Sequence, residues 1–422
     1  MAEDLLGTGR EVFFCRRPGR GVGVRRSLVS INDLTNEEVE AVFVGADEMA
    51  SLLRRGGPLD LCRGKILCTL FYEPSTRTRL SFESAMHRLG GAVLSTENAR
   101  VSSSAAKGET IRDSVRVVQH YADLLVMRHY LDGSTRVAAE CARIPVISGG
   151  DGTHEHPTQT LCDLYTMRKE KGKVQGLHVA LCGDLRYGRT VHSLAYGLAR
   201  FGARITCVAP PGFQLPAHVR ERLLREYGCR IREFSRLDEA IAGEASAPRR
   251  RSGDGLYQDL IEQFDVLYLT RVQKERLPRG EGPALAAESF RLSRALLRKA
   301  QEDALVLHPL PRVNELDYDV DEDKRAGYFR QASYGVAVRM ALTALFLGVV
   351  RSGGFAPGPR PRLSVRSVRV RGVRCINDRC VSLSEPDVRP RFVPAAEAGG
   401  LRCAYCEVEV RPPTRGRGEL FR

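Results

Sequence analysis

Short apolar segments alternate with helical stretches along most of this 422-residue chain, and this alternation constrains its fold more than any other feature. The apolar segments lie at residues 65–72, 91–96, 123–128, 177–184, 204–210, 264–270 and 304–310. Before the third of them, Ile111, Val115, Val118 and Ala122 recur at the spacing of one helical face. Strands that alternate with helices are typical of parallel sheets, so the sequence predicts an α/β fold with two doubly wound parallel-sheet domains.

The most distinctive motif is FYEPSTRTR at residues 71–79. A strand-like segment breaks at Pro74 and gives way to a helix expected from Thr78. Backbone N–H groups and the positive end of the helix dipole favour an anion at such a helix start. Four side chains could donate to a phosphate there: Ser75, Thr76, Arg77 and Thr78. An ordinary capped helix would account for the same hydroxyl residues, since Ser and Thr are common caps.

Polar residues also follow or border the later strand-like segments. They are Ser103 and Lys107 in VSSSAAKGET, Arg128 in LLVMRH, His156 and Gln159 in HEHPTQT, Arg189 in GDLRYGRTVHS, Arg271 and Gln273 in LTRVQKER, and residues 308–312 in HPLPR. Ligands of open parallel sheets bind beyond the carboxyl ends of the strands. These groups could therefore converge on one crevice.

These motifs carry a family resemblance. STRTR, VMRH, HPTQT, GDLRYGRTVHS, RVQKER and HPLPR occur in this order in the catalytic chain of aspartate carbamoyltransferase, which residues 30–350 closely resemble. Ornithine carbamoyltransferase shares the phosphate-binding run but usually has Cys-Leu-Pro where this chain has HPLP, and RVQKER favours aspartate. The resemblance implies transfer of the carbamoyl group of carbamoyl phosphate to L-aspartate, which gives N-carbamoyl-L-aspartate and phosphate in pyrimidine biosynthesis.

The resemblance also implies a role for each polar residue. Those expected to contact carbamoyl phosphate are Ser75, Thr76, Arg77, Thr78, Arg128, His156, Gln159 and the backbone carbonyls of Pro309 and Leu310. Those expected to hold the aspartate carboxylates are Arg189, Arg271 and Gln273. Those expected to act in catalysis are Arg77, Thr78, Lys107, Arg128 and His156. No cofactor is expected in the active site, because catalysis would come from positioning and charge stabilisation.

The loop that contains Ser103 and Lys107 has two interpretations. Its composition is typical of a flexible polar loop with one solvated lysine. In the resembled family this loop completes the active site of a neighbouring subunit, which implies a homotrimer or a higher assembly with shared active sites. Ala106 stands where the family often has a second lysine, so this loop carries one charge less.

Two pairs of closely spaced cysteines indicate a metal site near the C-terminus: Cys375 with Cys380, and Cys403 with Cys406. Four thiolates on tight turns can form a tetrahedral structural zinc site, and so small a module has too little core to fold unaided. Disulfides are the alternative interpretation. Residues 370–410 also resemble the zinc domain of the regulatory chain of aspartate carbamoyltransferase, which docks against catalytic chains.

That resemblance implies a small β-rich zinc-binding domain that serves assembly. The nucleotide-binding domain of the regulatory chain has no counterpart in this sequence, so we do not expect nucleotide feedback through this chain alone. A separate regulatory subunit could still restore it.

The expected domains follow one another along the chain. They are a basic extension at 1–26, a carbamoyl-phosphate-binding domain at 27–157 to which a helix at 333–350 returns, an aspartate-binding domain at 158–332, a linker at 351–369, the zinc-binding domain at 370–412 and a basic tail at 413–422. The segment 242–255, which contains APRRRSGDG, is interpreted as a surface insertion.

The formal net charge of +14 suggests an alternative function, a zinc-dependent scaffold or nucleic-acid-binding protein on an inactive transferase body. Residues 351–422 hold fifteen arginines against seven acidic residues, but few aromatic residues that could stack on bases. We therefore do not expect nucleic acid to bind. We also expect no membrane span, because no apolar run approaches about 18 residues. The cysteines outside the two pairs are scattered singly, which favours a reduced, cytoplasmic protein.

Overall fold

The computed structural model describes residues 26–242, 264–273, 290–352, 355, 367–370, 372–395 and 400–410. Residues 1–25 of the predicted basic extension, the tail at 413–422, most of the linker at 351–369 and all but the first residue of the insertion at 242–255 lie outside these ranges. Within the described part, no helix has the length and apolar character needed to cross a membrane.

The first sheet is parallel and has the strand order β2-β1-β3-β4. Its strands are β1 Ile66–Phe71, β2 Ala92–Thr96, β3 Leu124–His129 and β4 Val146–Asp151. The apolar runs β1 and β3 lie in the middle and are almost entirely buried, whereas β2 is a partly exposed edge. The strand order reverses at β1, which creates a switch point where ligands of such sheets bind.

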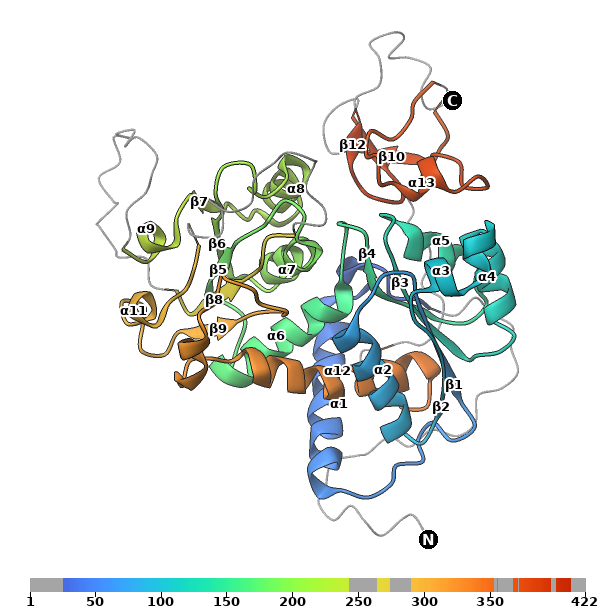
Figure 1. Ribbon diagram of the computed structural model, residues 1–422, viewed down its shortest axis with the longest axis horizontal. Coiled ribbons are helices and arrows are strands. Elements are labelled where there is room, and N and C mark those ends of the chain that lie inside the picture. The colour runs from blue at the N-terminus through green and yellow to red at the C-terminus, as the bar shows by residue number, and fades with distance from the viewer. Residues whose placement is uncertain are drawn as a thin grey trace.

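The second sheet is also parallel, with the order β7-β6-β5-β8-β9. Its strands are β5 His178–Cys182, β6 Arg204–Val208, β7 Arg232–Phe234, β8 Val266–Leu269 and β9 Leu305–Leu307. Its order reverses at β5. Two doubly wound sheets therefore confirm the predicted α/β fold class, and Figure 1 shows them on opposite sides of the molecule.

Helices cover and connect the two sheets. Those of the first half are η1 Ile31–Asp33, α1 Asn36–Arg55, α2 Thr76–Arg88, α3 Ala99–Ser102, η2 Ser104–Lys107, α4 Ile111–Val118, α5 Ser134–Cys141 and α6 Pro157–Lys171. Those of the second half are α7 Arg189–Arg200, α8 Ala217–Tyr227, α9 Leu237–Ala242, α11 Arg294–Leu297, η4 Tyr318–Glu322 and α12 Tyr328–Leu347.

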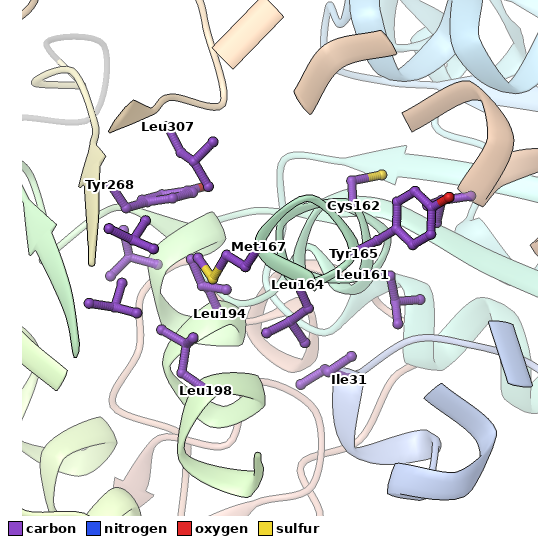
Figure 2. Packing of buried hydrophobic residues seen from close by; sticks show 14 of the residues in the cluster. Ile31, Leu161, Cys162, Leu164, Tyr165, Met167, Leu194, Leu198, Tyr268 and Leu307 are labelled. Carbon is purple, nitrogen blue, oxygen red and sulfur yellow. The ribbon is translucent and has the colours of Figure 1, made fainter. Parts of the chain in front are cut away.

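α6 and α12 lie between the sheets and contact strands of both (Figure 1). α6 is buried around most of its circumference, and Figure 2 shows Leu161, Leu164 and Met167 pointing outward from it in different directions. Leu194 from α7 and Tyr268 from β8 pack in the same cluster. One apolar core therefore joins the two halves, and it fixes the position of side chains at the start of α6.

The cysteine-rich module forms a small antiparallel sheet in the order β10-β11-β12. Its elements are α13 Val381–Ser384, β10 Phe392–Pro394, β11 Leu401–Cys403 and β12 Glu409–Val410. It lies above α4 and α5 in Figure 1, and its apolar residues belong to the same cluster as those under these two helices. The structure thus confirms a β-rich C-terminal module.

Three predicted boundaries differ from the structure. α2 begins at Thr76 and not at Thr78, because Ser75 takes the N-cap position. The returning helix begins at Tyr328 and ends at Leu347, whereas the sequence placed it at 333–350. Ser333 is therefore an exposed residue inside α12 and not near its start.

Candidate active site and metal centre

The N-terminus of α2 is not closed by its own side chains. Ser75 makes no capping hydrogen bond, and no acidic residue lies in the first turn. α1 shows the contrast, because Thr35 and Glu38 there cap each other's backbone N–H groups. The first N–H groups of α2 therefore remain available to an anion, which the helix dipole also favours.

Arg77 adds positive charge to this helix start. Although the residue is exposed, partial desolvation and then the nearby guanidinium of Arg271 lower its pKa. Arg271 follows β8, so each sheet supplies one of these two cations. Neighbouring guanidinium groups repel each other, and an anion that contacts both would relieve this repulsion.

His156 immediately precedes α6 and is 3% exposed. Its Nε2 lies 3.3 Å from Thr78 Oγ1 and its Nδ1 lies 3.4 Å from Thr158 Oγ1. Burial, and then the charges of surrounding arginines including Arg128 and Arg189, hold the pKa of His156 well below its ordinary value. The imidazole is therefore neutral near pH 7, so it can donate one hydrogen bond without carrying charge.

Glu73 connects arginines from the two halves, and sequence reasoning missed it. Its Oε2 accepts a hydrogen bond from Arg189 Nη2 at 2.6 Å and lies 3.2 Å from Arg128 Nε. Gly150 passes close to both arginines, because a Cβ there would lie 3.1 Å from Arg189 Nε and 3.3 Å from Arg128 Nη1. The available signal was one acidic residue inside the otherwise basic FYEPSTRTR motif.

Asp163 was also missed, and it ties three segments of the site together. Its Oδ1 accepts hydrogen bonds from Gln159 Nε2 at 2.7 Å and Gln331 Nε2 at 2.6 Å, and its Oδ2 accepts one from the Tyr268 hydroxyl at 2.8 Å. Gln331 Oε1 in turn accepts a hydrogen bond from the backbone N–H of His308 at 3.0 Å. Burial raises the pKa of Asp163 to about 6. No sequence motif marks this residue, because its partners Gln331 and Tyr268 lie more than a hundred positions away in the chain.

A cavity of about 320 Å³ opens between α2, α6, α12 and the loop after β9. Its lining includes Thr76, Arg77, Gln159, His308, Pro309, Leu310, Gln331 and Arg339. Five of these eight residues were predicted from the sequence as substrate contacts. Gln273, another predicted residue, donates from Nε2 to the carbonyl of Tyr187 at 2.7 Å, two positions before Arg189.

Ser103 and Lys107 do not join this group within one chain. Ser103 Oγ donates to the carbonyl of Ala99 at 2.5 Å, so it stabilises its own short loop. Lys107 is exposed, and its side chain has no hydrogen-bond or ion-pair partner among the described residues. The loop is near the exposed edge strand β2, with Leu94 45% and Val101 66% exposed.

The four paired cysteines converge in the module. Sγ of Cys375 lies 3.5 Å from Sγ of Cys406, Sγ of Cys380 lies 3.7 Å from Sγ of Cys403, and all four ligand atoms lie within 4.8 Å of one another. Sulfur atoms around a tetrahedral zinc ion, with bonds of about 2.3 Å, stand about 3.8 Å apart. The cluster therefore fits such an ion. The disulfide alternative is wrong, because all four cysteines are free.

Comparison with known proteins places this geometry in a family. Residues 26–169 match the family model of the aspartate/ornithine carbamoyltransferase carbamoyl-P binding domain, and residues 254–346 match that of the Asp/Orn binding domain. The catalytic subunit of aspartate carbamoyltransferase from Methanopyrus kandleri is 47% identical over 324 residues, which cover 76% of this chain and 97% of that protein. The subunit from Thermococcus gammatolerans is 46% identical over 325 residues, with 77% and 98% covered. The chain belongs to the aspartate carbamoyltransferase family.

Solved structures of the aspartate carbamoyltransferase family have the same fold as this chain. The catalytic subunit of M. jannaschii aspartate transcarbamoylase superposes with a TM-score of 0.66 at 42% identity, over 76% of this chain and 98% of that one. Aspartate transcarbamoylase from Trypanosoma cruzi, in complex with carbamoyl phosphate and aspartate, gives 0.65 at 36% identity, over 76% and 96%. Residues 366–412 match a further family model, that of the aspartate carbamoyltransferase regulatory chain metal binding domain.

In this member of the aspartate carbamoyltransferase family, the metal-binding module contacts the first parallel-sheet domain directly beside Cys380 and Cys406. The backbone N–H of Asp132, in the loop after β3, donates to the carbonyl of Arg379 at 2.9 Å. The backbone N–H of Val381 donates to the carbonyl of Asp132 at 3.0 Å. Gly133 leaves room for this contact, because a Cβ there would lie 2.6 Å from Tyr405.

Glu407, which follows a paired cysteine, bridges both halves of the aspartate carbamoyltransferase body. Its carboxylate forms ion pairs with Arg136 of α5 at 4.0 Å and with Arg222 of α8. Arg402 of β11 also donates to Glu226 of α8 at 3.0 Å. The module therefore contacts helices that belong to both sheets.

Proposed function

We propose that the chain transfers the carbamoyl group of carbamoyl phosphate to L-aspartate and supplies N-carbamoyl-L-aspartate for pyrimidine biosynthesis. The observation that carries the proposal is one cavity that Arg77, Gln159, Pro309 and Leu310 line together. The Trypanosoma cruzi relative, solved in complex with carbamoyl phosphate and aspartate, supports it.

The open end of α2 would bind the phosphate through Ser75, Thr76, Arg77 and Thr78. Neutral His156 would donate to the carbamoyl oxygen together with Thr78 and Arg128. This arrangement suits a reaction in which negative charge develops on that oxygen, because fixed donors stabilise such charge. The amine of aspartate would attack the carbamoyl carbon, and phosphate would leave and accept the proton that the amine loses.

The remaining predicted residues would position the two substrates. Gln159, held by Asp163, and the carbonyls of Pro309 and Leu310 would orient the carbamoyl amino group. Arg189, Arg271 and Gln273 would bind the aspartate carboxylates. Since Glu73 contacts both Arg189 and Arg128, it would keep the aspartate and carbamoyl sites in register.

We propose that trimers complete the site, with Ser103 and Lys107 entering from a neighbouring subunit. The exposed apolar residues Leu94 of β2 and Val101 of the loop lie at this edge, and they support a subunit interface there. We also propose that Cys375, Cys380, Cys403 and Cys406 bind a structural zinc ion. Because this module is fused to the catalytic body, one cytoplasmic chain would form assemblies larger than the trimer, with or without a separate regulatory subunit.

The test is carbamoyl transfer by the full-length, zinc-loaded protein with aspartate or ornithine as acceptor. We expect product only with aspartate, and Arg77→Ala should lower turnover by about 10²–10³-fold, as the loss of one charge-stabilising donor typically does. Arg88→Ala is the matched control, because Arg88 lies in the last turn of the same helix and contacts Ser84. Transfer to ornithine alone would reassign the acceptor. Silence with both acceptors would favour an inactive scaffold.

A further inference from the structure

Arg339 of α12 is a buried cation that forms no ion pair with the residues that the structure describes. It is 5% exposed, and no carboxylate forms an ion pair with it in the part of the chain that the structure describes. Its Nη1 donates weakly to Cys162 Sγ at 3.4 Å and to the carbonyl of Gly335 at 3.3 Å, while its Nε has no hydrogen-bond partner in that part of the chain. The charge of Asp163 acts on Arg339 without forming an ion pair. A buried guanidinium with no ion pair and only weak hydrogen bonds is costly, so this arrangement points to an anionic ligand.

The position of Arg339 indicates which ligand. It lines the same cavity as Thr76, Arg77 and Gln159. Burial and the charges of Arg128 and Arg189 are the larger causes of the lowered pKa of His156, and the charge of Arg339 lowers this pKa further. Arg339 therefore lies close enough to the proposed carbamoyl and phosphate sites to act on a dianion there.

Two neighbours hold the guanidinium in this place. It lies over the ring of Phe82 in α2, with 5.3 Å between Arg339 Cζ and the ring centroid. Gly335, one turn earlier in α12, leaves the space that the guanidinium occupies, because a Cβ at that position would lie 2.5 Å from Arg339 Nη1. The sequence thus provides both a stacking surface and a gap for one cation.

We propose that Arg339 is a further phosphate-binding residue of this site and attracts the dianion from the buried floor of the cavity while Arg77 binds it at the exposed rim. The inference rests on the proposed function, which supplies the dianionic substrate. Because phosphate is present in both substrate and product, Arg339 contributes to binding more than to the chemical step.

The experiment measures inorganic phosphate binding by calorimetry and carbamoyl-transfer kinetics on the full-length protein. We expect Arg339→Met to weaken phosphate binding and to raise the KM for carbamoyl phosphate by about tenfold each, with kcat changed by less than about threefold. Arg339→Lys, which keeps the charge, should recover most of the affinity. Unchanged phosphate affinity in a folded Arg339→Met protein would overturn the proposal, as would equal losses in the Met and Lys variants.

Gly335→Ala provides a second test that also serves if Arg339→Met does not fold. The added methyl group displaces the guanidinium without removing its charge, so phosphate affinity should fall; unchanged affinity would again overturn the proposal. Wild-type transfer to aspartate is measured in parallel. A wild-type protein that binds phosphate but transfers nothing would refute the proposed function separately from the role of Arg339.

Discussion

Asp163 allows a test of how single residues position the site. Asp163→Asn keeps the size of the side chain but removes the charge that strengthens its hydrogen bonds to Gln159, Gln331 and Tyr268. We expect kcat/KM for carbamoyl phosphate to fall about tenfold, which corresponds to about 1.4 kcal/mol.

The matched control is Asp47→Asn. Asp47 also accepts a hydrogen bond from a tyrosine hydroxyl, that of Tyr165 at 2.8 Å, but it lies on α1 outside the cavity. This variant should keep wild-type kinetics. Equal losses in the two variants would show that Asp163 supports stability and not the position of Gln159.

His129 predicts how stability depends on pH. The Nδ1 of His129 accepts a hydrogen bond from the backbone N–H of Leu131 at 3.1 Å, and burial lowers the pKa of His129 to about 3. In the unfolded chain a histidine has a pKa of about 6.5, so between these values the unfolded state binds more protons. Stability should therefore fall as the pH drops below about 6.5, by about 2 kcal/mol at pH 5 from this residue.

The check is denaturant unfolding between pH 7.5 and 5 of the wild-type protein and of His129→Asn, whose side-chain oxygen can replace Nδ1 as an acceptor. The variant should show a shallower loss of unfolding free energy on acidification. Identical slopes in the two proteins would assign the acid sensitivity to other groups.

At the level of elements, the starts of α1 and α2 predict opposite phenotypes for similar substitutions. Thr35→Ala removes half of a capping box, so it should lower the free energy of unfolding by about 1 kcal/mol and leave transfer unchanged. Ser75→Ala removes a hydroxyl that caps nothing, so it should leave stability unchanged and weaken carbamoyl phosphate binding. Thermal unfolding and steady-state kinetics on both variants decide between these outcomes. A loss of stability in Ser75→Ala would contradict the open helix start.

Element prediction from the sequence succeeded where burial produces a continuous apolar run. β1, β3, β5 and β8 follow such runs and were predicted. β4 was missed because Val146–Asp151 contains two glycines, which strands disfavour, and the neighbouring strand β3 supplies the pairing. β7 was missed because Arg232–Phe234 is short and mostly polar.

For the site, the sequence showed the residues that belong to motifs. Arg77 could be placed near one crevice because it follows a predicted strand, and His156 and Gln159 because they belong to the motif HPTQT. Glu73, Asp163 and Arg339 could not, because each depends on at least one partner more than fifty positions away. Such contacts exist only after the two halves pack around α6 and α12.

At the level of the whole molecule, the metal site should control docking of the module. We expect chelation of zinc to disrupt the fold around the four cysteines, because so small a module has few other stabilising contacts. Amide hydrogen exchange at Asp132 and Val381, which bond across the junction, should then accelerate by at least about tenfold.

The amide of Val126, inside β3, is the internal reference and should keep its protection. Restoring zinc should restore protection at the junction. Equal exchange at Asp132 with and without metal would mean that docking does not depend on the cysteine cluster.

The single chain that carries both the catalytic body and the module also changes how docking responds to dilution. A module on a separate polypeptide leaves its partner when the protein concentration falls below the dissociation constant. Here a short covalent connection keeps the local concentration of the module on the order of millimolar, whatever the amount of enzyme in the cell. Contacts such as those of Glu407 with Arg136 and Arg222 can therefore be individually weak and still remain occupied.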